Sequence, residues 1–160
     1  MDEHSLYDKI RKDARVCPNL VRIQKIHGGQ FSSGGTDLMW SSYAGNFAVE
    51  LKYHPTPKRQ STEVDPYKLC SELQLRAMRE MWELNGMSAL AVGFMIQSTT
   101  FLQFFPGVPP LPAPWYPLLG ARKMCDIRKM RQTFDFEHIA DILAAFVKYR
   151  FGMIEWEDIP

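Results

Sequence analysis

The sequence predicts an α/β protein in which a mixed sheet is flanked by helices. Apolar residues alternate from Phe47 to His54, which is the two-residue period of a strand. They recur at helical spacing between Ser71 and Gly86, and they are nearly continuous from Met87 to Gln97, which is typical of a strand buried on both faces. A strand, a helix and a buried strand in succession predict a β-α-β unit with parallel strands.

The N-terminal third supplies the other elements of the sheet. Residues 3–15 carry Leu6 and Ile10 on one face and predict a helix, which Pro18 ends. Residues 19–26 alternate and predict a first strand. Residues 34–52 predict a hairpin with a two-residue turn at Ala44-Gly45 or Gly45-Asn46.

The second half is expected to add a helix, two strands and a C-terminal extension. In the helix that ends at Gly86, we expect the apolar residues of one stripe to face the sheet, namely Leu73, Ala77, Met81 and Leu84. Phe101 to Phe105 predicts a further strand hairpinned to the one before it. The elements up to residue 105 therefore follow the order α-β-β-β-α-β.

We divide the chain into three parts. Residues 1–105 form the predicted core, residues 106–118 a Pro-rich extended strap, and residues 119–160 an extension with an amphipathic helix that packs on the core. A chain of 160 residues is long enough to bury one sizeable core.

The N-terminus is charged, so we expect no signal peptide, and no apolar run is long enough to span a membrane, so we expect no membrane partner. The three cysteines, Cys17, Cys70 and Cys125, have no metal-type or redox-type spacing, so we expect reduced thiols. We therefore expect a cytoplasmic protein.

One face of the predicted hairpin carries a candidate catalytic site. Glu50 and Lys52 share a strand face because they are two residues apart, and the expected registers place Asp37 on the same face, opposite Lys52 or His54. Two neighbouring carboxylates repel each other unless a cation lies between them, and a hard ion such as Mg²⁺ prefers such oxygen ligands. Lys52 could hold the scissile phosphate or orient the attacking water.

Glu-x-Lys on a strand is, by itself, also typical of a solvated surface ion pair. The order and spacing of the motifs argue for a site: Gly-Gly-Thr-Asp at 34–37, Glu-Leu-Lys at 50–52 and Ser-Glu-Leu-Gln at 71–74. This series resembles the PD-(D/E)XK nuclease superfamily, and most closely its small virus-type VRR-NUC and Holliday-junction-resolvase-like members. The resemblance covers roughly residues 3 to 96.

The resemblance implies a restriction-endonuclease-like core and assigns roles to individual residues. It implies that Asp37, Glu50 and the Leu51 carbonyl hold the metal, and that Lys52 and Gln74 assist catalysis. Glu3, or secondly Asp8, would be the acid that the first helix contributes. Thr36 departs from the usual proline, and Gln24 stands where relatives often have glutamate.

The implied activity is Mg²⁺-dependent endonucleolytic cleavage of DNA, including branched DNA or phage replication and recombination DNA, with Mn²⁺ as a substitute. The partners would be DNA and a second copy of the chain or a larger complex. Two alternatives stay open: a non-catalytic nuclease-fold module for DNA binding or virion assembly, and cleavage of RNA. Ser71 and Gln74 also have the spacing of a capping box, so a purely structural role for Gln74 is equally open.

With a net charge of only +1, a nucleic-acid-binding protein must concentrate its basic residues. Two clusters are candidates, and for each a solvated polar face is the open alternative: His54, Lys58 and Arg59, and then Arg122, Lys123, Arg128, Lys129 and Arg131. Trp115 and Tyr116 could stack on bases, although packing onto the domain is the favoured interpretation.

Overall fold

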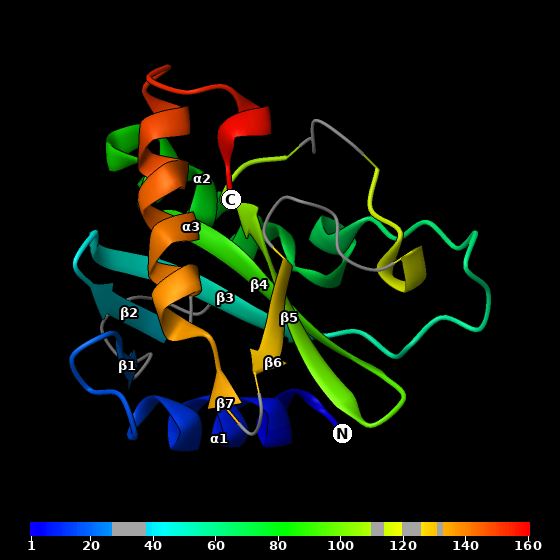
Figure 1. Ribbon diagram of the computed structural model, residues 1–160. Coiled ribbons are helices and arrows are strands. Elements are labelled where there is room, and N and C mark those ends of the chain that lie inside the picture. Colours follow the sequence, from blue (N-terminus) through cyan, green and yellow to red (C-terminus); the bar gives the residue numbers. More distant parts are fainter. Residues whose placement is uncertain (27–37, 110–113, 120–125, 131–132) are drawn as a thin grey trace.

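The computed structural model describes residues 1–26, 38–109, 114–119, 126–130 and 133–160, with residues 119 and 126–130 as backbone (Figure 1). Three α-helices lie in these ranges: α1 (Glu3–Ala14), α2 (Glu72–Asn85) and α3 (Phe136–Arg150). The strands within them are β1 (Arg22–Lys25), β2 (Leu38–Ser42), β3 (Gly45–Tyr53), β4 (Ser88–Ile96), β5 (Thr99–Pro106), β6 (Asp126–Met130) and β7 (Thr133–Phe134). Short 3₁₀ helices follow at Pro66–Leu69, Pro117–Leu119 and Trp156–Asp158.

The strands form a mixed sheet, which confirms the predicted α/β class. In the described part of the chain the order is β1-β2-β3-β4-β5-β6-β7, so every strand lies beside its neighbour in sequence. β3 and β4 are parallel and are connected through α2, as predicted, whereas the other pairs are antiparallel. The first six major elements follow the expected α-β-β-β-α-β order, while β6 and β7 were not predicted.

The β2-β3 hairpin turns one residue earlier than the first of the two predicted turns and two residues earlier than the second. Ser42 pairs with Gly45, so Tyr43 and Ala44 form the turn, and Gly45 adopts a φ of +116° that other residues rarely take. The glycine therefore follows the turn and does not lie within it. Leu38 pairs with Val49, where the predicted registers required Leu51 or Tyr53. Because this shift is an even number of residues, it leaves each side chain on the predicted face.

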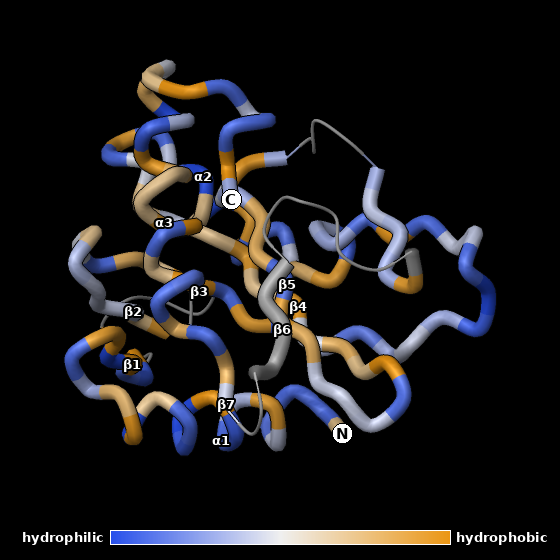
Figure 2. The backbone as a smooth tube through the Cα atoms, in the orientation of Figure 1, coloured by the Kyte–Doolittle hydropathy of each residue, from blue (hydrophilic) through white to orange (hydrophobic). Residues whose placement is uncertain are grey.

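Two apolar clusters cover the two faces of the sheet. Alternate residues of the central strands, such as Phe47, Val49 and Leu102, pack in one cluster with Leu6 of α1 and Phe146 of α3. The other cluster contains the following residues: Tyr67, Met78, Leu90, Val92, Phe94, Phe105 and Trp115. Figure 1 shows α3 in front of the sheet and α2 behind it, and Figure 2 shows hydrophobic residues concentrated on the central strands.

The inward face of α2 differs from the prediction. Leu73 is 50% exposed and Leu84 is 77% exposed, whereas Met78 is fully buried and Trp82 is 7% exposed. The buried positions are four residues apart, and the same stripe begins one turn earlier at Gln74. The apolar pattern was misleading because the first inward residue of this helix is polar.

The C-terminal segment, which contains β7 and α3, packs in the same apolar cluster as α1. Phe136, Ile139 and Phe146 belong to the cluster that contains Leu6. The buried carboxylate of Asp13 in α1 accepts a 3.3 Å hydrogen bond from the Phe134 backbone N–H at the start of this segment. The division at residues 105 and 118 stays a prediction.

Candidate active site

A buried carboxylate lies at the centre of the candidate site. Glu50 is fully buried in β3, opposite Leu90 of β4, on the sheet face that α2 covers. Its Oε1 atom lies 3.2 Å from the Nζ atom of Lys52, which is two residues further along the same strand. A buried ionised carboxylate is costly unless a cation and hydrogen-bond donors compensate it, and Lys52 supplies the positive charge.

Gln74 joins the same carboxylate from α2. Its Nε2 atom donates a 2.9 Å hydrogen bond to Glu50 Oε1, and its Oε1 atom accepts a 2.9 Å bond from the Ser71 backbone N–H. The Ser71 hydroxyl accepts from the Gln74 backbone N–H at 3.2 Å, which completes a capping box. Gln74 therefore completes the capping box and contacts the Glu50 carboxylate at the same time, because the two ends of one amide have different partners.

Glu3 approaches from the first turn of α1. Its Oε2 atom is 4.0 Å from Lys52 Nζ, and its side chain is 47% exposed. A cavity of about 260 Å³ opens beside it and reaches Leu38, the first described residue of β2. Asp8, the second candidate on this helix, instead lies 3.4 Å from the exposed His4.

The carboxylates determine the ionisation of Lys52. Burial, the largest influence, lowers the pKa of the Lys52 ammonium, but the attraction of Glu50 and Glu3 and the hydrogen bond to Glu50 together outweigh it. The net result is a pKa above the ordinary value of 10.5. Lys52 is therefore a cation at neutral pH and not a proton acceptor.

Cys70 is a member of the site that the sequence analysis missed. Burial raises the pKa of its thiol to about 12, and the negative charges of Glu50 and Glu3 act in the same direction while Lys52 opposes them. The thiol is thus protonated at neutral pH and is a poor nucleophile. Its position directly before Ser71, the N-cap of α2, was the available sequence signal.

Other predicted site residues are placed as follows. Asp37 lies outside the described residues. The Leu51 side chain is 3% exposed and belongs to the opposite face of the sheet, in the cluster with Leu6. Gln24 lies exposed on β1 and pairs with Met39, which in turn pairs with Ala48. Because Ala48 is two residues before Glu50, Gln24 lies on the sheet face that carries Glu50.

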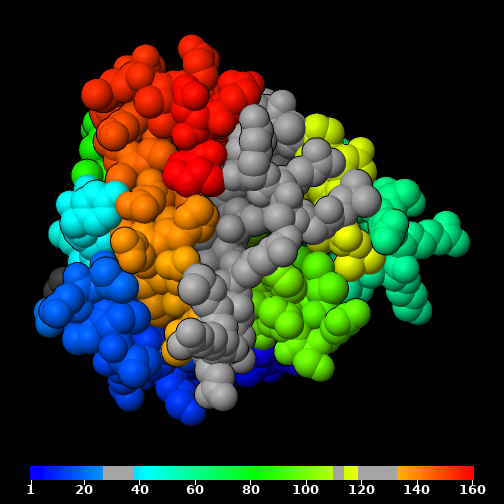
Figure 3. All heavy atoms as spheres, viewed as in Figure 1, coloured from blue at the N-terminus to red at the C-terminus, as the bar shows by residue number. Residues whose placement is uncertain are grey.

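The first predicted nucleic-acid-binding cluster follows β3. Lys58 and Arg59 are exposed on a loop that protrudes from the molecule in Figure 3. His54 is half-buried and packs edge-on against Trp115, with ring centroids 6.4 Å apart. Trp115 is 3% exposed, so packing onto the domain is confirmed and stacking of this ring on a base is excluded in this arrangement.

The second cluster falls mainly outside the described residues, which include neither Arg122, Lys123 nor Arg131. The backbones of Arg128 and Lys129 lie in β6, where they pair with Phe101 and Phe134. Nucleic-acid binding by this second cluster therefore stays a prediction.

The described residues contain neither a ready-made cluster of metal ligands nor a membrane-spanning helix. No group of three or more histidine, cysteine or acidic side chains in them is arranged to hold a metal ion. Within the same ranges, no helix has both the length and the apolar character needed to cross a membrane.

Comparison with known proteins identifies no family for this chain. No protein-family model matches the chain. A search of curated proteins likewise returns no match.

Proposed function

We propose that the protein is a Mg²⁺-dependent endonuclease of the PD-(D/E)XK type that cleaves DNA phosphodiester bonds. The observation that carries the proposal is the buried Glu50 carboxylate, which Lys52 and Gln74 contact from two different elements. A surface ion pair would be solvated, whereas this carboxylate is fully buried in the middle of a sheet. The order α-β-β-β-α-β, which the periodicity predicted, is also the order that the resemblance to this superfamily implies.

Asp37 is proposed as the second carboxylate of this site. It directly precedes Leu38, and Leu38 pairs with Val49 in the antiparallel hairpin. Continuing that register by one residue would bring Asp37 opposite Glu50, which is closer than the sequence analysis expected. Strand parity would then put both carboxylates on one face.

These residues suit a hard divalent ion. Mg²⁺ is usually held by one or two carboxylates, with waters and substrate phosphate completing its shell. Asp37, Glu50 and the Leu51 carbonyl would hold it, and Glu3 would approach from the rim. When bound, the ion polarises the phosphodiester and lowers the pKa of water.

The other side chains act by charge and position. The Lys52 ammonium stays protonated, so it offers a fixed positive charge to the phosphate oxygens as negative charge builds up in the transition state. Gln74 fixes the orientation of Glu50 through its amide, and the capping box in turn holds Gln74. Cys70 contributes no nucleophile because its pKa is about 12.

The test is incubation of supercoiled plasmid, linear duplex and a four-way junction with the protein in Mg²⁺ or Mn²⁺. We expect the wild type and Lys148→Ala, an exposed position on α3, to cut equally. Asp37→Asn, Glu50→Gln and Lys52→Met should not cut, while circular dichroism shows which variants are folded. Cutting by a folded Glu50→Gln variant would reject the site. Adding RNA to the same assay tests the alternative that the protein cleaves RNA.

A second candidate is a non-catalytic module with the same fold. The observation in its favour is that Lys52 already neutralises Glu50 at 3.2 Å, as a structural ion pair would. Absence of cutting of every substrate by folded wild type in either metal would favour this module.

A further inference from the structure

Basic residues are concentrated on α1 and β1, in a region that the sequence analysis did not select. Between residues 9 and 25 the sequence has six lysines and arginines and a single acid, Asp13, in a chain whose net charge is +1. Asp13 is buried and lies 3.1 Å from Lys9, so it neutralises that lysine and none of the others. The remaining five are exposed: Arg11, Lys12, Arg15, Arg22 and Lys25.

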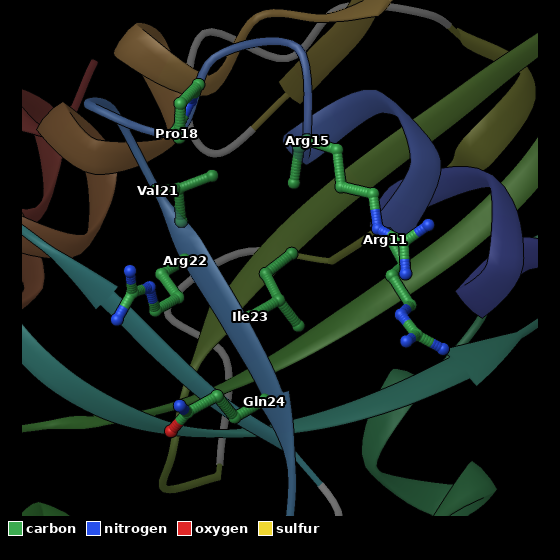
Figure 4. A pocket seen from close by; sticks show the side chains of 8 residues that line it. Arg11, Arg15, Pro18, Val21, Arg22, Ile23 and Gln24 are labelled. Carbon is green, nitrogen blue, oxygen red and sulfur yellow. The ribbon is translucent and has the colours of Figure 1, made fainter.

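Three of these arginines line a cavity of about 320 Å³ between α1 and β1, together with apolar residues such as Val21 and Ile23. Figure 4 shows Arg11 and Arg15 extending from α1 on one side and Arg22 turned outward from β1 on the other. β1 is an edge strand of the described sheet, so the cavity lies at the margin of the molecule. It is therefore open to a long ligand that passes along the surface.

The arginines have no counter-charge among the described residues. No carboxylate of the described chain lies within 4.0 Å of Arg11, Arg15 or Arg22. Arg11 and Arg15 are four residues apart on one helix face, where like charges repel each other. An anion bound beside them would remove that repulsion.

We propose that α1 and β1 bind the sugar-phosphate backbone of a nucleic acid. Arg11 and Arg15 lie eight and twelve residues after Glu3 at the rim of the candidate site, so they are about 12 and 18 Å from it along the helix axis. Phosphates follow one another at about 3.4 Å of duplex axis per strand, so both arginines would meet phosphates a few nucleotides from the cut. This step rests on the proposed function, since it takes Glu3 as the rim of the active site.

The spread of the three guanidinium groups favours a polyanion over a single small anion. A site for one phosphate needs its donors to converge on one point, whereas Figure 4 shows Arg22 directed away from the two arginines of α1. Contacts distributed along a surface match a chain of phosphates, which arginines bind without regard to sequence. We therefore expect backbone binding with strong salt dependence and no base preference.

The test is fluorescence anisotropy with a labelled 20-base-pair DNA duplex and the wild-type protein in EDTA, so that binding is separate from cleavage. The variant Arg11→Gln/Arg15→Gln/Arg22→Gln is compared with Arg76→Gln/Arg79→Gln/Lys148→Gln, which removes equal charge from exposed positions on α2 and α3. We expect the first to bind at least about tenfold more weakly, with a salt slope shallower by about three, at 0.9 per phosphate contact. The control should bind like the wild type.

Wild-type affinity and salt slope in the first variant, an equal loss in the control, or no binding by the wild type would each overturn the proposal. If the triple variant does not fold, Arg11→Gln and Arg22→Gln alone should each reduce the slope by about one. Equal displacement of the duplex by polyglutamate of the same charge would also overturn it, because an acidic protein would then fit as well. If DNA binding depends on the three arginines but the protein does not cleave DNA in Mg²⁺, the nuclease proposal is rejected and the binding surface is retained. If the triple variant binds normally and cleaves DNA, the binding surface is rejected and the nuclease proposal is retained.

Discussion

At the scale of single residues, the Glu50-Lys52 pair determines what the site can do. Glu50 is fully buried, and the Lys52 side chain is 15% exposed, so the two charges compensate each other with little help from water. Such a pair contributes little net stability compared with apolar residues, but removal of one partner leaves an uncompensated buried charge.

We predict that Lys52→Met lowers the free energy of unfolding by about 3–5 kcal/mol at pH 7, measured by urea denaturation. Glu50→Gln added to Lys52→Met should restore a large part of the loss, whereas Lys148→Met should be neutral. Because the pKa of Lys52 is raised on folding, its contribution is fully present below its ordinary pKa of 10.5 and is lost as the pH rises through the folded value. No difference between the single and double variants would contradict a charge pair.

The two ends of the Gln74 amide can be separated by mutation. Ser71→Ala removes the cap alone, so it should lower stability by about 1 kcal/mol and leave cleavage unchanged. Gln74→Ala removes the cap and the hydrogen bond to Glu50, so it should also lower the cleavage rate by roughly 10- to 100-fold. Equal effects of the two variants on cleavage would assign Gln74 a capping role alone.

Cys70 should be chemically inert despite its place in the site. With a pKa of about 12, its thiol stays protonated until strongly alkaline pH. In a variant that carries Cys17→Ser and Cys125→Ser, we expect iodoacetamide to modify the remaining thiol very slowly at pH 8. Denaturation should make the reaction fast, and rapid labelling of the folded protein would contradict the predicted environment.

At the scale of elements, the end of α2 depends on one glycine and one arginine. Gly86 has a φ of +69°, and a Cβ atom added there would lie 2.9 Å from Cβ of Arg150 in α3. Arg150 also donates hydrogen bonds to the backbone carbonyls of Trp82 and Glu83, at 2.9 and 3.0 Å. The C-terminus of α2 is thus fixed by its contact with α3.

Gly86→Ala should therefore destabilise the fold by at least about 1–2 kcal/mol, which is the cost of a left-handed residue with a side chain. Thermal unfolding measures this effect. Gly152→Ala is a matched control because Gly152 has a φ of +70° but no atom within 4 Å of an added Cβ. Similar losses in the two variants would show that the contact with Arg150 costs nothing.

How far the elements could be predicted depended on local chemistry. Alternation predicted β3, and the glycine at the end of α2 was read correctly because its positive φ is a local requirement. The inward face of α2 was predicted wrongly, since Leu73 and Leu84 are exposed while Gln74 faces the sheet. An apolar pattern cannot identify a helix face that begins with a polar residue whose partner, here Glu50, lies in the sheet.

At the scale of the whole molecule, the candidate site is formed where three segments far apart in the sequence meet. Glu3, Glu50 and Gln74 lie on α1, β3 and α2, and Lys52 contacts two of them. Strand parity could predict that Glu50 and Lys52 share a face. The basic run between residues 9 and 25 and the place of Cys70 before an N-cap are visible in the sequence. That Cys70 lies beside Glu50, and that Arg11, Arg15 and Arg22 line one cavity, depends on how the helices pack against the sheet.

The proposed metal site is best tested by a crystal structure of the protein soaked in Mn²⁺, with data collected for anomalous scattering. We expect an anomalous peak at coordination distance from a carboxylate oxygen of Glu50, with Asp37 as a second ligand and Lys52 beside the ion. A structure without a peak at Glu50, in which Asp37 lies on the opposite face of the sheet, would contradict the proposed site.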